Sequence, residues 1–264
     1  MLAIITAFED EIRDYLSSGG LRLIERKGDL RFYRASEEAE IIVAVGAFGR
    51  ERAEEATRHV IEDYECAMVV SAGFGGGARP GLNPGDIFVC DAVKAVEGPP
   101  VFWRAENAEE IAVDDVTMMV LGQKMVDERS RFNYGKCLTL PQLVSNSAMK
   151  QWIGDAFGVH VIDMESYWVC KVAAEHGKPY LVIRSVLDPM EQTLPTFVGE
   201  TLGYGRFATL VRAVRYIAAH PSKAPKLWRL TTQAKQARAA LAEFLVGMTV
   251  LGDSQSMDLA VDAG

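Results

Sequence analysis

The sequence contains no cluster of metal-binding or redox residues. Its cysteines are few and far apart, at Cys66, Cys90, Cys137 and Cys170, and its four histidines fall in separate predicted elements. Structural zinc sites and dithiol redox centres need ligands at short, regular spacings, and no Cys-x-x-Cys pair occurs. We therefore expect buried, reduced thiols, no metal and no disulfide framework, which is typical of a cytoplasmic protein.

Long runs of one residue type are also missing. No apolar run approaches the roughly 18 residues of a membrane-spanning helix. The apolar start, Met1–Thr6, meets Glu9 and Asp10 too early, and without a basic flank, to be a signal peptide. The net charge is −8, and no long basic run occurs before the C-terminal region. Because a nucleic-acid groove needs clustered Lys and Arg to neutralise phosphates, we expect no nucleic-acid partner.

The chain of 264 residues is 49 % hydrophobic and 24 % charged, which is the balance of a globular protein with one large core. Apolar runs with strand character alternate with segments of helical periodicity. We predict strands at residues 2–6, 22–26, 30–35, 40–47, 67–71, 87–95, 136–140, 161–163 and 183–188, and helices at 9–17, 50–63, 116–128, 147–157, 207–219 and 225–246. This order predicts the α/β fold class, with helices on both faces of a sheet.

One stretch organises the rest of the chain. Val161–Ser166 runs a short apolar strand into the pair Met164–Glu165, and Ile183–Pro189 is an apolar strand that ends on a lone carboxylate, Asp188. With the helical stretch between them, the two strands predict one βαβ unit. Because ligands in such folds lie beyond the carboxyl ends of the strands, we expect Glu165 and Asp188 to stand in the same crevice.

Two glycine-containing segments follow predicted strands. The first, Gly46–Arg50, precedes a charged helix, a geometry that favours anions. The second, Ser71–Gly77, is the most glycine-dense stretch of the chain. It is predicted either to be a loop whose backbone amides and Ser71 hydroxyl approach a ligand, or to be a tight turn without such a role. Neither segment has the Lys-Ser/Thr ending of a phosphate-binding P-loop.

The residues alone leave two interpretations open. A carboxylate at a strand end, a second one after a methionine and a Gly/Ser loop can polarise a leaving group and grip hydroxyl groups. This combination suits cleavage of a glycosidic bond to a nitrogen base. Strand-end carboxylates are equally often structural and cap a neighbouring loop. The sequence contains no Gly-x-Ser-x-Gly elbow, so it does not indicate a serine hydrolase.

The pair Met164–Glu165 followed by Arg184–Asp188 resembles the nucleoside phosphorylase superfamily, which includes purine nucleoside phosphorylases and methylthioadenosine/adenosylhomocysteine nucleosidases. The similarity covers roughly residues 1–215 and includes the segments Thr6–Glu11, Gly46–Gly49, Ser71–Gly73 and Pro84–Asp86. It implies a single domain with a central mixed, largely parallel twisted sheet, and a reaction that needs no cofactor. The expected substrates are a purine nucleoside and phosphate or water.

The resemblance implies a role for each matching residue. Asp188 would protonate or hydrogen-bond the purine N7 as the base leaves. Glu165 would bind the ribose hydroxyls, with Met164 packed against the sugar. The residues that would face the nucleophile or help to hold an anion are Ser71, Ala72, Gly73, Gly49 and Arg50.

The identity of the nucleophile depends on the acidic segment Glu9–Glu11. Phosphorylases of this superfamily commonly have an arginine there that holds phosphate, whereas nucleosidases carry a glutamate matching Glu11 that activates water. Glu11 is therefore a candidate catalytic residue beside Asp188. For phosphorolysis, the positive charge would have to come from Arg50, Arg52 or Arg79.

A closer similarity to hopanoid-associated phosphorylases, which act on adenosylhopane, gives phosphorolysis a slight preference. It rests on the segments Ser71–Asp86, Asp163–Ser166, Asp188–Pro189, Leu194–Pro195 and Pro221–Leu230. The competing hypotheses are a hydrolytic nucleosidase and a non-catalytic nucleoside-binding protein.

The C-terminal region is predicted to be separate from the catalytic part. We expect a catalytic domain at residues 1–220 and an amphipathic helix with a flexible tail at 221–264. The helix docks on the domain or on a second subunit, or it contacts a membrane surface. A substrate with a lipid tail would give membrane contact a purpose. Because relatives commonly form homo-oligomers, the resemblance implies a cytoplasmic homo-oligomer, with peripheral membrane contact as an extension of that prediction.

Overall fold

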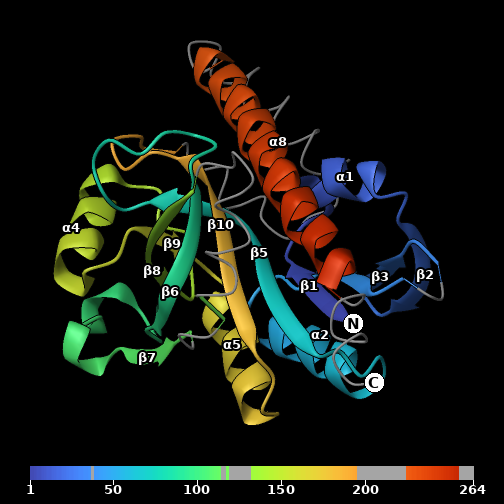
Figure 1. The fold of residues 1–264 in the computed structure, drawn as a ribbon. Coiled ribbons are helices and arrows are strands. Elements are labelled where there is room, and N and C mark those ends of the chain that lie inside the picture. Colours follow the sequence, from blue (N-terminus) through green and yellow to red (C-terminus); the bar gives the residue numbers. More distant parts are fainter. Residues whose placement is uncertain (37–38, 114–116, 119–131, 195–223, 256–264) are drawn as a thin grey trace.

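The computed structural model describes residues 1–36, 39–113, 117–118, 132–194 and 224–255 (Figure 1). Its strands are β1 (Leu2–Thr6), β2 (Arg22–Lys27), β3 (Leu30–Arg34), β4 (Ile41–Val45), β5 (Met68–Gly77), β6 (Ile87–Ala95), β7 (Glu109–Ala112), β8 (Asn133–Thr139), β9 (Val161–Asp163) and β10 (Tyr180–Asp188). Its helices are α1 (Glu9–Ser18), α2 (Arg50–Glu62), α4 (Ser147–Phe157), α5 (Ser166–Glu175) and α8 (Ala224–Gln255).

The strands form one mixed sheet. Its order is β10-β6-β8-β9-β5-β1-β4-β3-β2, with β7 beside β6. Because β10 also pairs with β5, the strands β5, β9, β8, β6 and β10 close into a ring. Among the described residues, five of the ten strand pairings are parallel. The predicted mixed α/β fold is confirmed, with parallel and antiparallel pairings in equal number.

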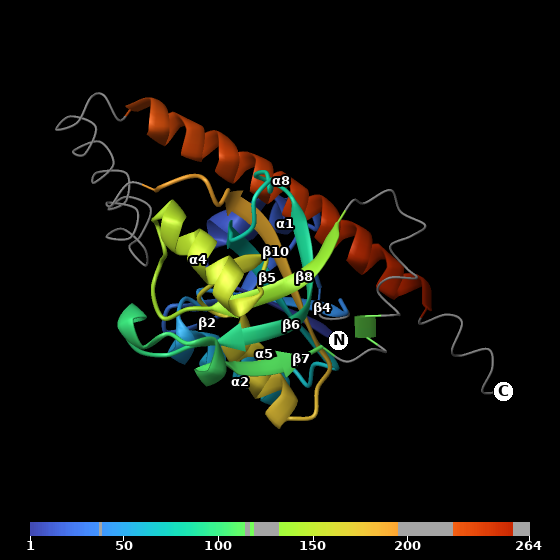
Figure 2. The same ribbon diagram turned by 90° about the vertical axis from the view of Figure 1, so that its left-hand side faces the viewer.

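Helices cover both faces of the sheet (Figures 1 and 2). Helices α2 and α5 pack together on one face, in a core to which β1 contributes Ala3 and Ile5. Helices α1 and α8 cover the opposite face, where Ile4 of β1 shares a core with Leu241 and Phe244 of α8. Successive residues of β1 therefore enter different cores, because side chains alternate across a strand. Helix α4 closes a third, smaller core.

Local signals set the helix ends. Helix α1 begins with the acidic run Glu9–Glu11, whose charges suit the positive N-terminal end of the helix dipole. Helix α4 begins after Asn146, whose Oδ1 accepts a hydrogen bond from the Met149 N–H at 3.1 Å. It ends at Gly158, whose φ of 67° is a left-handed conformation that glycine adopts without strain.

Helix α8 docks along the domain, as one of its predicted interpretations requires. Arg238 Nε lies 2.9 Å from Asp14 Oδ1 of α1. Gln233 exchanges two amide hydrogen bonds with Gln192, at 2.7 and 3.0 Å. Trp228, near the start of the helix, is 78 % exposed. Of the helices in the described ranges, none is both long and apolar enough to cross a membrane.

The prediction of a glycine-rich loop after residue 71 was wrong. Strand β5 continues through Ser71–Gly77 and pairs with β10 and β9. Glycine is uncommon in strands, but here neighbours occupy the space that side chains would need. A Cβ at Gly75 would lie 3.3 Å from Ile162 O, and one at Gly77 would lie 3.3 Å from Met190 N. The glycines therefore allow close packing of backbone rather than a turn.

The prediction of a βαβ unit was also wrong. Strand β9 runs antiparallel to β5, whereas β10 runs parallel to it. Strands β9 and β10 therefore run in opposite directions along their shared neighbour, and α5 does not connect parallel strands. Glu165 follows β9 and Asp188 ends β10, but no parallel crossover places the two side chains together.

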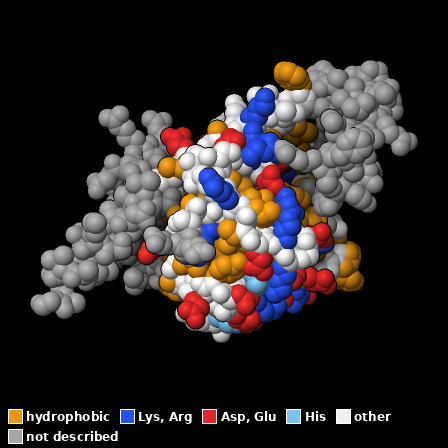
Figure 3. All heavy atoms as spheres, turned by 90° about the vertical axis from the view of Figure 1, so that its right-hand side faces the viewer, with side chains coloured by type: hydrophobic (Ala, Val, Ile, Leu, Met, Phe, Trp, Pro, Cys, Tyr) orange, Lys and Arg blue, Asp and Glu red, His pale blue; other side chains and the backbone are white. Residues whose placement is uncertain are grey.

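Several predicted features lie outside the described residues. The predicted helix at residues 207–219, most of the one at 116–128 and the boundary at residue 220 belong to this group. The segment after Glu97 contains 3-10 turns at Pro100–Phe102 and Ala105–Asn107 and then β7. On the face that carries α1 and β2, Lys and Arg side chains are interspersed with Asp and Glu (Figure 3).

Candidate active site

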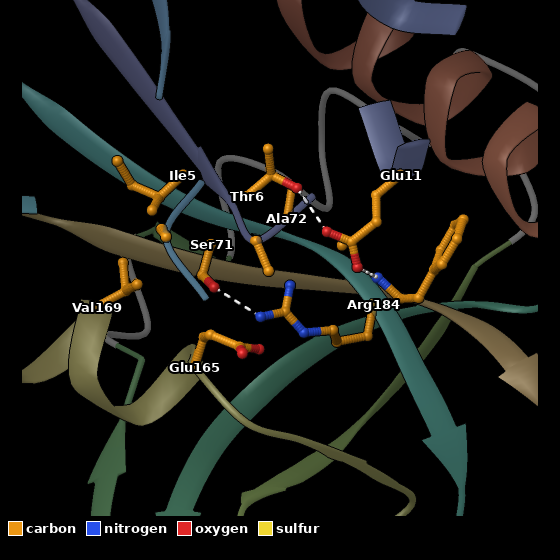
Figure 4. Close-up of a pocket in the computed structure, with 12 residues that line it drawn as sticks. Ile5, Thr6, Glu11, Ser71, Ala72, Glu165, Val169 and Arg184 are labelled. Carbon is orange, nitrogen blue, oxygen red and sulfur yellow. Dashed lines mark hydrogen bonds between the residues drawn. The ribbon is translucent and has the colours of Figure 1, made fainter. Parts of the chain in front are cut away.

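Glu11 is held at the start of α1, directly after β1. Its side chain is 7 % exposed. Its Oε2 accepts hydrogen bonds from Thr6 Oγ1 at 2.8 Å and from the Phe8 N–H at 2.9 Å. Its Oε1 accepts one from the Phe74 N–H of β5 at 2.9 Å (Figure 4). The bond to Phe8 is the return contact that a glutamate in the first helical turn makes to the residue before the helix. These three donors fix the carboxylate over β5.

Burial raises the pKa of Glu11 above its ordinary value. The hydrogen bonds from Phe74, Phe8 and Thr6 and the charge of Arg184 act in the opposite direction but do not cancel the effect of burial. A buried carboxylate with a raised pKa is a stronger base than one in water. Glu11 is therefore suited to take a proton from a bound molecule near neutral pH.

Gly73 allows β5 to pass directly beneath Glu11. A Cβ at this position would lie 3.1 Å from Glu11 Oε1 and 3.2 Å from Oε2. These distances are shorter than ordinary contacts, so a side chain here would displace the carboxylate. The glycine is thus required by the approach of an acidic side chain.

Glu165 enters the same region from the start of α5. Its Oε1 accepts a hydrogen bond from the Gly49 N–H at 3.1 Å. Gly49 has a φ of 78° and precedes α2. Burial raises the pKa of Glu165 to about 8, and the nearby carboxylates of Asp163 and Glu11 add to this effect. The group that the corner at Gly49 binds is therefore the carboxyl group of Glu165.

Arg184 links these elements through a buried network. Its Nε donates to Asp163 Oδ2 at 2.7 Å, and its Nη2 donates to Ser71 Oγ at 2.8 Å. Asp163 also accepts from Thr139 Oγ1 at 2.6 Å and from the Ser166 N–H at 3.1 Å. Burial opposes the charge of Arg184, but Asp163 raises its pKa above the ordinary value. The guanidinium is thus a permanent charge balanced by Asp163.

The sequence patterns predicted no role for Arg184 or Asp163. Both lie in the segments that carry the family resemblance, and a charged residue inside the apolar run 181–186 was the available signal.

The side chains of Glu11, Glu165 and Arg184 line a small cavity of about 10 Å³, which is on the scale of one water molecule. Of the residues that the sequence predicted, those that line it are Glu11, Ser71, Ala72, Gly73 and Glu165, and Arg184 joins them (Figure 4). Met164, Gly49, Arg50 and Asp188 do not line it. Gly49 is linked to the cavity only through the hydrogen bond that its N–H donates to Glu165.

Arg50 points away from this cavity. Its Nε donates to Glu54 at 3.0 Å, its Nη1 donates to Glu97, and its guanidinium lies 4.1 Å from the centre of the Trp168 ring. The other two arginines that could have supplied charge are also paired elsewhere, Arg52 with Asp29 and Arg79 with Asp155. The side chain of each of these three arginines is itself at least one-third exposed.

Asp188 ends β10 and is 4 % exposed. It pairs in register with Gly76 of β5, and Arg184 pairs with Gly73. At about 3.3 Å per residue, three residues of strand separate the two levels by roughly 10 Å. Burial raises the pKa of Asp188 to about 6, and an ion pair with Lys150 of α4 limits this rise. Asp188 can therefore exist in protonated form close to neutral pH.

The part of the chain that the structure describes contains no group of three or more His, Cys, Asp or Glu side chains suited to a metal ion. Its cysteines are free and buried.

A mixed sheet flanked by helices, with acidic side chains and the buried Arg184 of β10 around one cavity, defines an enzyme with the fold of nucleoside phosphorylases and nucleosidases. The family model of the Phosphorylase superfamily matches residues 1–246. The chain belongs to this superfamily.

Individual relatives are more distant. The chain is 23 % identical over 211 residues to a 5′-methylthioadenosine/S-adenosylhomocysteine nucleosidase of Bacillus thuringiensis subsp. konkukian, with 71 % of this chain and 85 % of the relative covered. The futalosine hydrolase of Helicobacter pylori has a similar structure, with a TM-score of 0.70, 18 % identity and coverage of 94 % and 96 %. The 5′-methylthioadenosine/S-adenosylhomocysteine nucleosidase of Helicobacter pylori, in complex with an inhibitor, gives a TM-score of 0.71, 18 % identity and coverage of 96 % and 97 %.

Proposed function

We propose that this protein hydrolyses the N-glycosidic bond of a purine nucleoside. The observation that carries the proposal is the buried Glu11 carboxylate, which three hydrogen bonds hold at a cavity of about the size of one water molecule. In this mechanism Glu11 takes a proton from a water whose oxygen bonds to the anomeric carbon of the sugar. The bond from that carbon to the purine breaks, and the base accepts the electron pair.

Asp188 is the proposed proton donor to the leaving base. With its pKa raised to about 6, it can give a proton to the purine N7, so that the base leaves as a neutral molecule. The products are then the free purine and a sugar that carries a hydroxyl on its anomeric carbon. The roughly 10 Å between the Asp188 level and the Arg184 level of β10 is on the scale of a nucleoside.

Glu165 is the proposed ligand of the ribose hydroxyls. It lines the cavity beside Glu11, and hydroxyl groups can donate to a carboxylate or accept from a protonated carboxyl. Met164 precedes it and is proposed to pack against the sugar. Ser71 faces the nucleophile, since its hydroxyl is at the cavity and accepts from Arg184.

The charge of the cavity supports water rather than phosphate as the nucleophile. Two carboxyl groups line it, and the Arg184 guanidinium that also lines it is balanced by Asp163. Phosphate carries negative charge and needs uncompensated donors or cations. The sequence similarity gives phosphorolysis a slight preference, and this acidic lining is the reason to reverse it.

The 5′ substituent is a finer part of the proposal. The names of the relatives given above state their substrates, which are 5′-methylthioadenosine, S-adenosylhomocysteine or futalosine. We propose an adenine nucleoside with a substituted 5′ position as the substrate class. Four finer points stay predictions from the sequence. They are a lipid-linked substrate such as adenosylhopane, the homo-oligomeric state, the cytoplasmic location and the membrane contact of α8.

The test is an assay of purine release from a panel of nucleosides, with and without phosphate. The panel contains 5′-methylthioadenosine, S-adenosylhomocysteine, futalosine and adenosylhopane. We expect release that is independent of phosphate, with the sugar recovered as a free reducing sugar. Recovery of a sugar 1-phosphate, only when phosphate is present, would establish phosphorolysis instead. Thermal stabilisation by nucleosides without any product would support the non-catalytic hypothesis.

A further inference from the structure

Lys150 of α4 is a buried cation outside the cavity described above. Its side chain is fully buried, with an exposed fraction of 0 %. Its Nζ donates to Asp188 Oδ2, and it also donates to Pro189 O and Gln192 O, each at 2.9 Å. An ammonium has three N–H donors and no acceptor. Lys150 therefore has one acceptor for each proton, and all three lie in the segment 188–192.

The burial of this charge calls for a specific reason. A lysine that leaves water loses several kcal/mol of solvation, and a surface lysine on α4 would avoid that cost. The buried positions of α4 are Lys150, Ile153, Gly154 and Phe157. Lys150 thus occupies a place on the apolar face of the helix, where an aliphatic residue would stabilise the fold more simply. Buried ion pairs of this kind are better explained by the arrangement that they impose than by stability.

The arrangement here distinguishes the two oxygens of Asp188. Oδ2 accepts the hydrogen bond from Lys150. Oδ1 lies on the side of β5, where a Cβ at Gly76 would be 3.6 Å from it. An oxygen that accepts from an ammonium keeps its lone pair engaged, so the proton of the neutral acid resides on the other oxygen.

We propose that Lys150 is a positioning residue for Asp188: its ammonium binds Oδ2, fixes the end of β10 on α4, and leaves Oδ1 as the oxygen that carries and delivers the proton to the base. After transfer, the same ammonium stabilises the carboxylate that remains. This inference rests on the proposed function for its catalytic meaning. The link between the two side chains is independent of that function.

The charges around Asp188 make this link measurable. Strand β5 contributes Gly76 and Gly77 beside Asp188, and Ile162 of β9 lies against Gly76. Helix α8 reaches the following segment through the neutral Gln233. On β10 itself, Arg184 is bound to Asp163. Glu191 follows along the chain and is exposed. Among the described residues, Lys150 is the charged side chain recorded in contact with Asp188.

The experiment replaces Lys150 with methionine, which is apolar and of similar length. Carboxyl-labelled aspartate is followed by NMR during a pH titration, and the Asp188 signal is identified by its absence in Asp188→Asn. An opposite charge in contact lowers a carboxyl pKa by roughly 1–3 units. We therefore expect the midpoint of the Asp188 titration to rise by about that amount in Lys150→Met. An unchanged midpoint would overturn the link.

The second part of the experiment measures the rate of purine release as a function of pH. Asp188 must be protonated to act, so activity falls as the pH rises through its pKa, and Lys150→Met should move this limb to higher pH. We expect kcat to fall roughly 10- to 100-fold, with KM little changed. In the Asp188→Asn background, Lys150→Met should add no further loss. Two outcomes would show that Lys150 is only a structural residue. One is a fall in kcat without a shift of the alkaline limb of the pH profile, and the other is full additivity of the losses from Lys150→Met and Asp188→Asn.

Controls separate these outcomes from poor folding. Lys94 is a second lysine near α4; it is partly buried, and its Nζ donates to Phe157 O at 3.0 Å. Lys94→Met should leave the limb in place. If Lys150→Met does not fold, Lys150→Gln removes the same charge and gives the same titration. If the unmodified protein releases no purine, the proposed function fails, whereas the NMR titration still decides whether Lys150 governs Asp188.

Discussion

Replacement of Glu11 by glutamine removes a carboxylate while it keeps the shape of the side chain. The carboxylate accepts hydrogen bonds from Thr6, Phe8 and Phe74. A glutamine oxygen can replace Oε2, but its amide then points a donor at the Phe74 N–H. One backbone donor is left without an acceptor, which costs about 1–3 kcal/mol. The loss of a buried charge offsets part of this cost, so we expect a folded protein with a slightly lower Tm.

The effect on turnover should be larger. A neutral amide cannot take the proton of the attacking water, and general-base catalysis contributes roughly 10²–10⁴-fold to a rate. At about 1.4 kcal/mol per factor of ten, this is roughly 3–5 kcal/mol of transition-state stabilisation. The assay is the initial rate of purine release at saturating nucleoside, with CD and thermal melts as folding measurements.

A matched control exists two residues away in the same helix. Glu9 makes an ion pair with Arg31 at 2.6 Å and is 31 % exposed. Glu9→Gln is therefore the same chemical change in α1, away from the cavity, and it should alter stability by no more than about 1 kcal/mol and leave turnover near that of the unmodified protein. A well-folded Glu11→Gln that keeps a rate close to that of Glu9→Gln would refute the role of Glu11 as the base.

Two further predictions concern the lining of the cavity. Gly73→Ala places a methyl group 3.1–3.2 Å from both Glu11 oxygens and should lower kcat roughly 10- to 100-fold. The control Gly19→Ala, whose methyl group meets only the flexible end of Leu21 and the end of α1, should leave kcat unchanged. Equal kcat values for the two variants would show that the Glu11 position is not critical. Glu165→Gln tests the raised pKa of about 8: because the folded state holds this proton more tightly than the unfolded chain, stability is lost as the pH rises from about 4.5 to about 8, by at most about 5 kcal/mol. The glutamine variant lacks this loss, so its Tm should exceed that of the unmodified protein at about pH 9 and differ little at about pH 5; parallel Tm curves would contradict the shift.

The sequence was sufficient to predict features that depend on local patterns. Asp188 at the end of an apolar strand, the acidic start of α1 and the end of α4 at Gly158 follow from hydrophobic runs and helix signals, and the structure has them where they were expected. The convergence of Glu11 with Glu165 was implied by the family resemblance. Periodicity does not contain it, because 154 positions of chain separate the two residues.

The failures have a common physical cause. Strand propensity disfavours glycine, so the run after Ser71 looked like a loop, but the contacts that make glycine necessary there come from Glu11, Ile162 and Met190, far away in the sequence. The opposite directions of β9 and β10 depend likewise on the direction in which each one pairs with β5. Such pairings are long-range choices that no local window records.

Lys150 was overlooked for a different reason. A lysine in a predicted helix is normally assigned to the solvent face. In α4, however, Lys150 precedes Ile153, Gly154 and Phe157 by three, four and seven residues, so it belongs to the same helical face as the buried positions. A charged residue in register with an apolar stripe is therefore a signal that the sequence already contained.

The docking of α8 has a consequence for how the protein is made. Helix α8 binds α1 through Arg238 and Asp14, and it binds the segment after Asp188 through Gln233 and Gln192. The core beneath it joins Ile12 of α1 to residues 241–245. The helix that carries Glu11 is translated well before α8, yet its apolar face is not fully covered until α8 has left the ribosome. The nascent chain should therefore remain inactive, and dependent on protection of that face, until synthesis has passed well beyond Asp188.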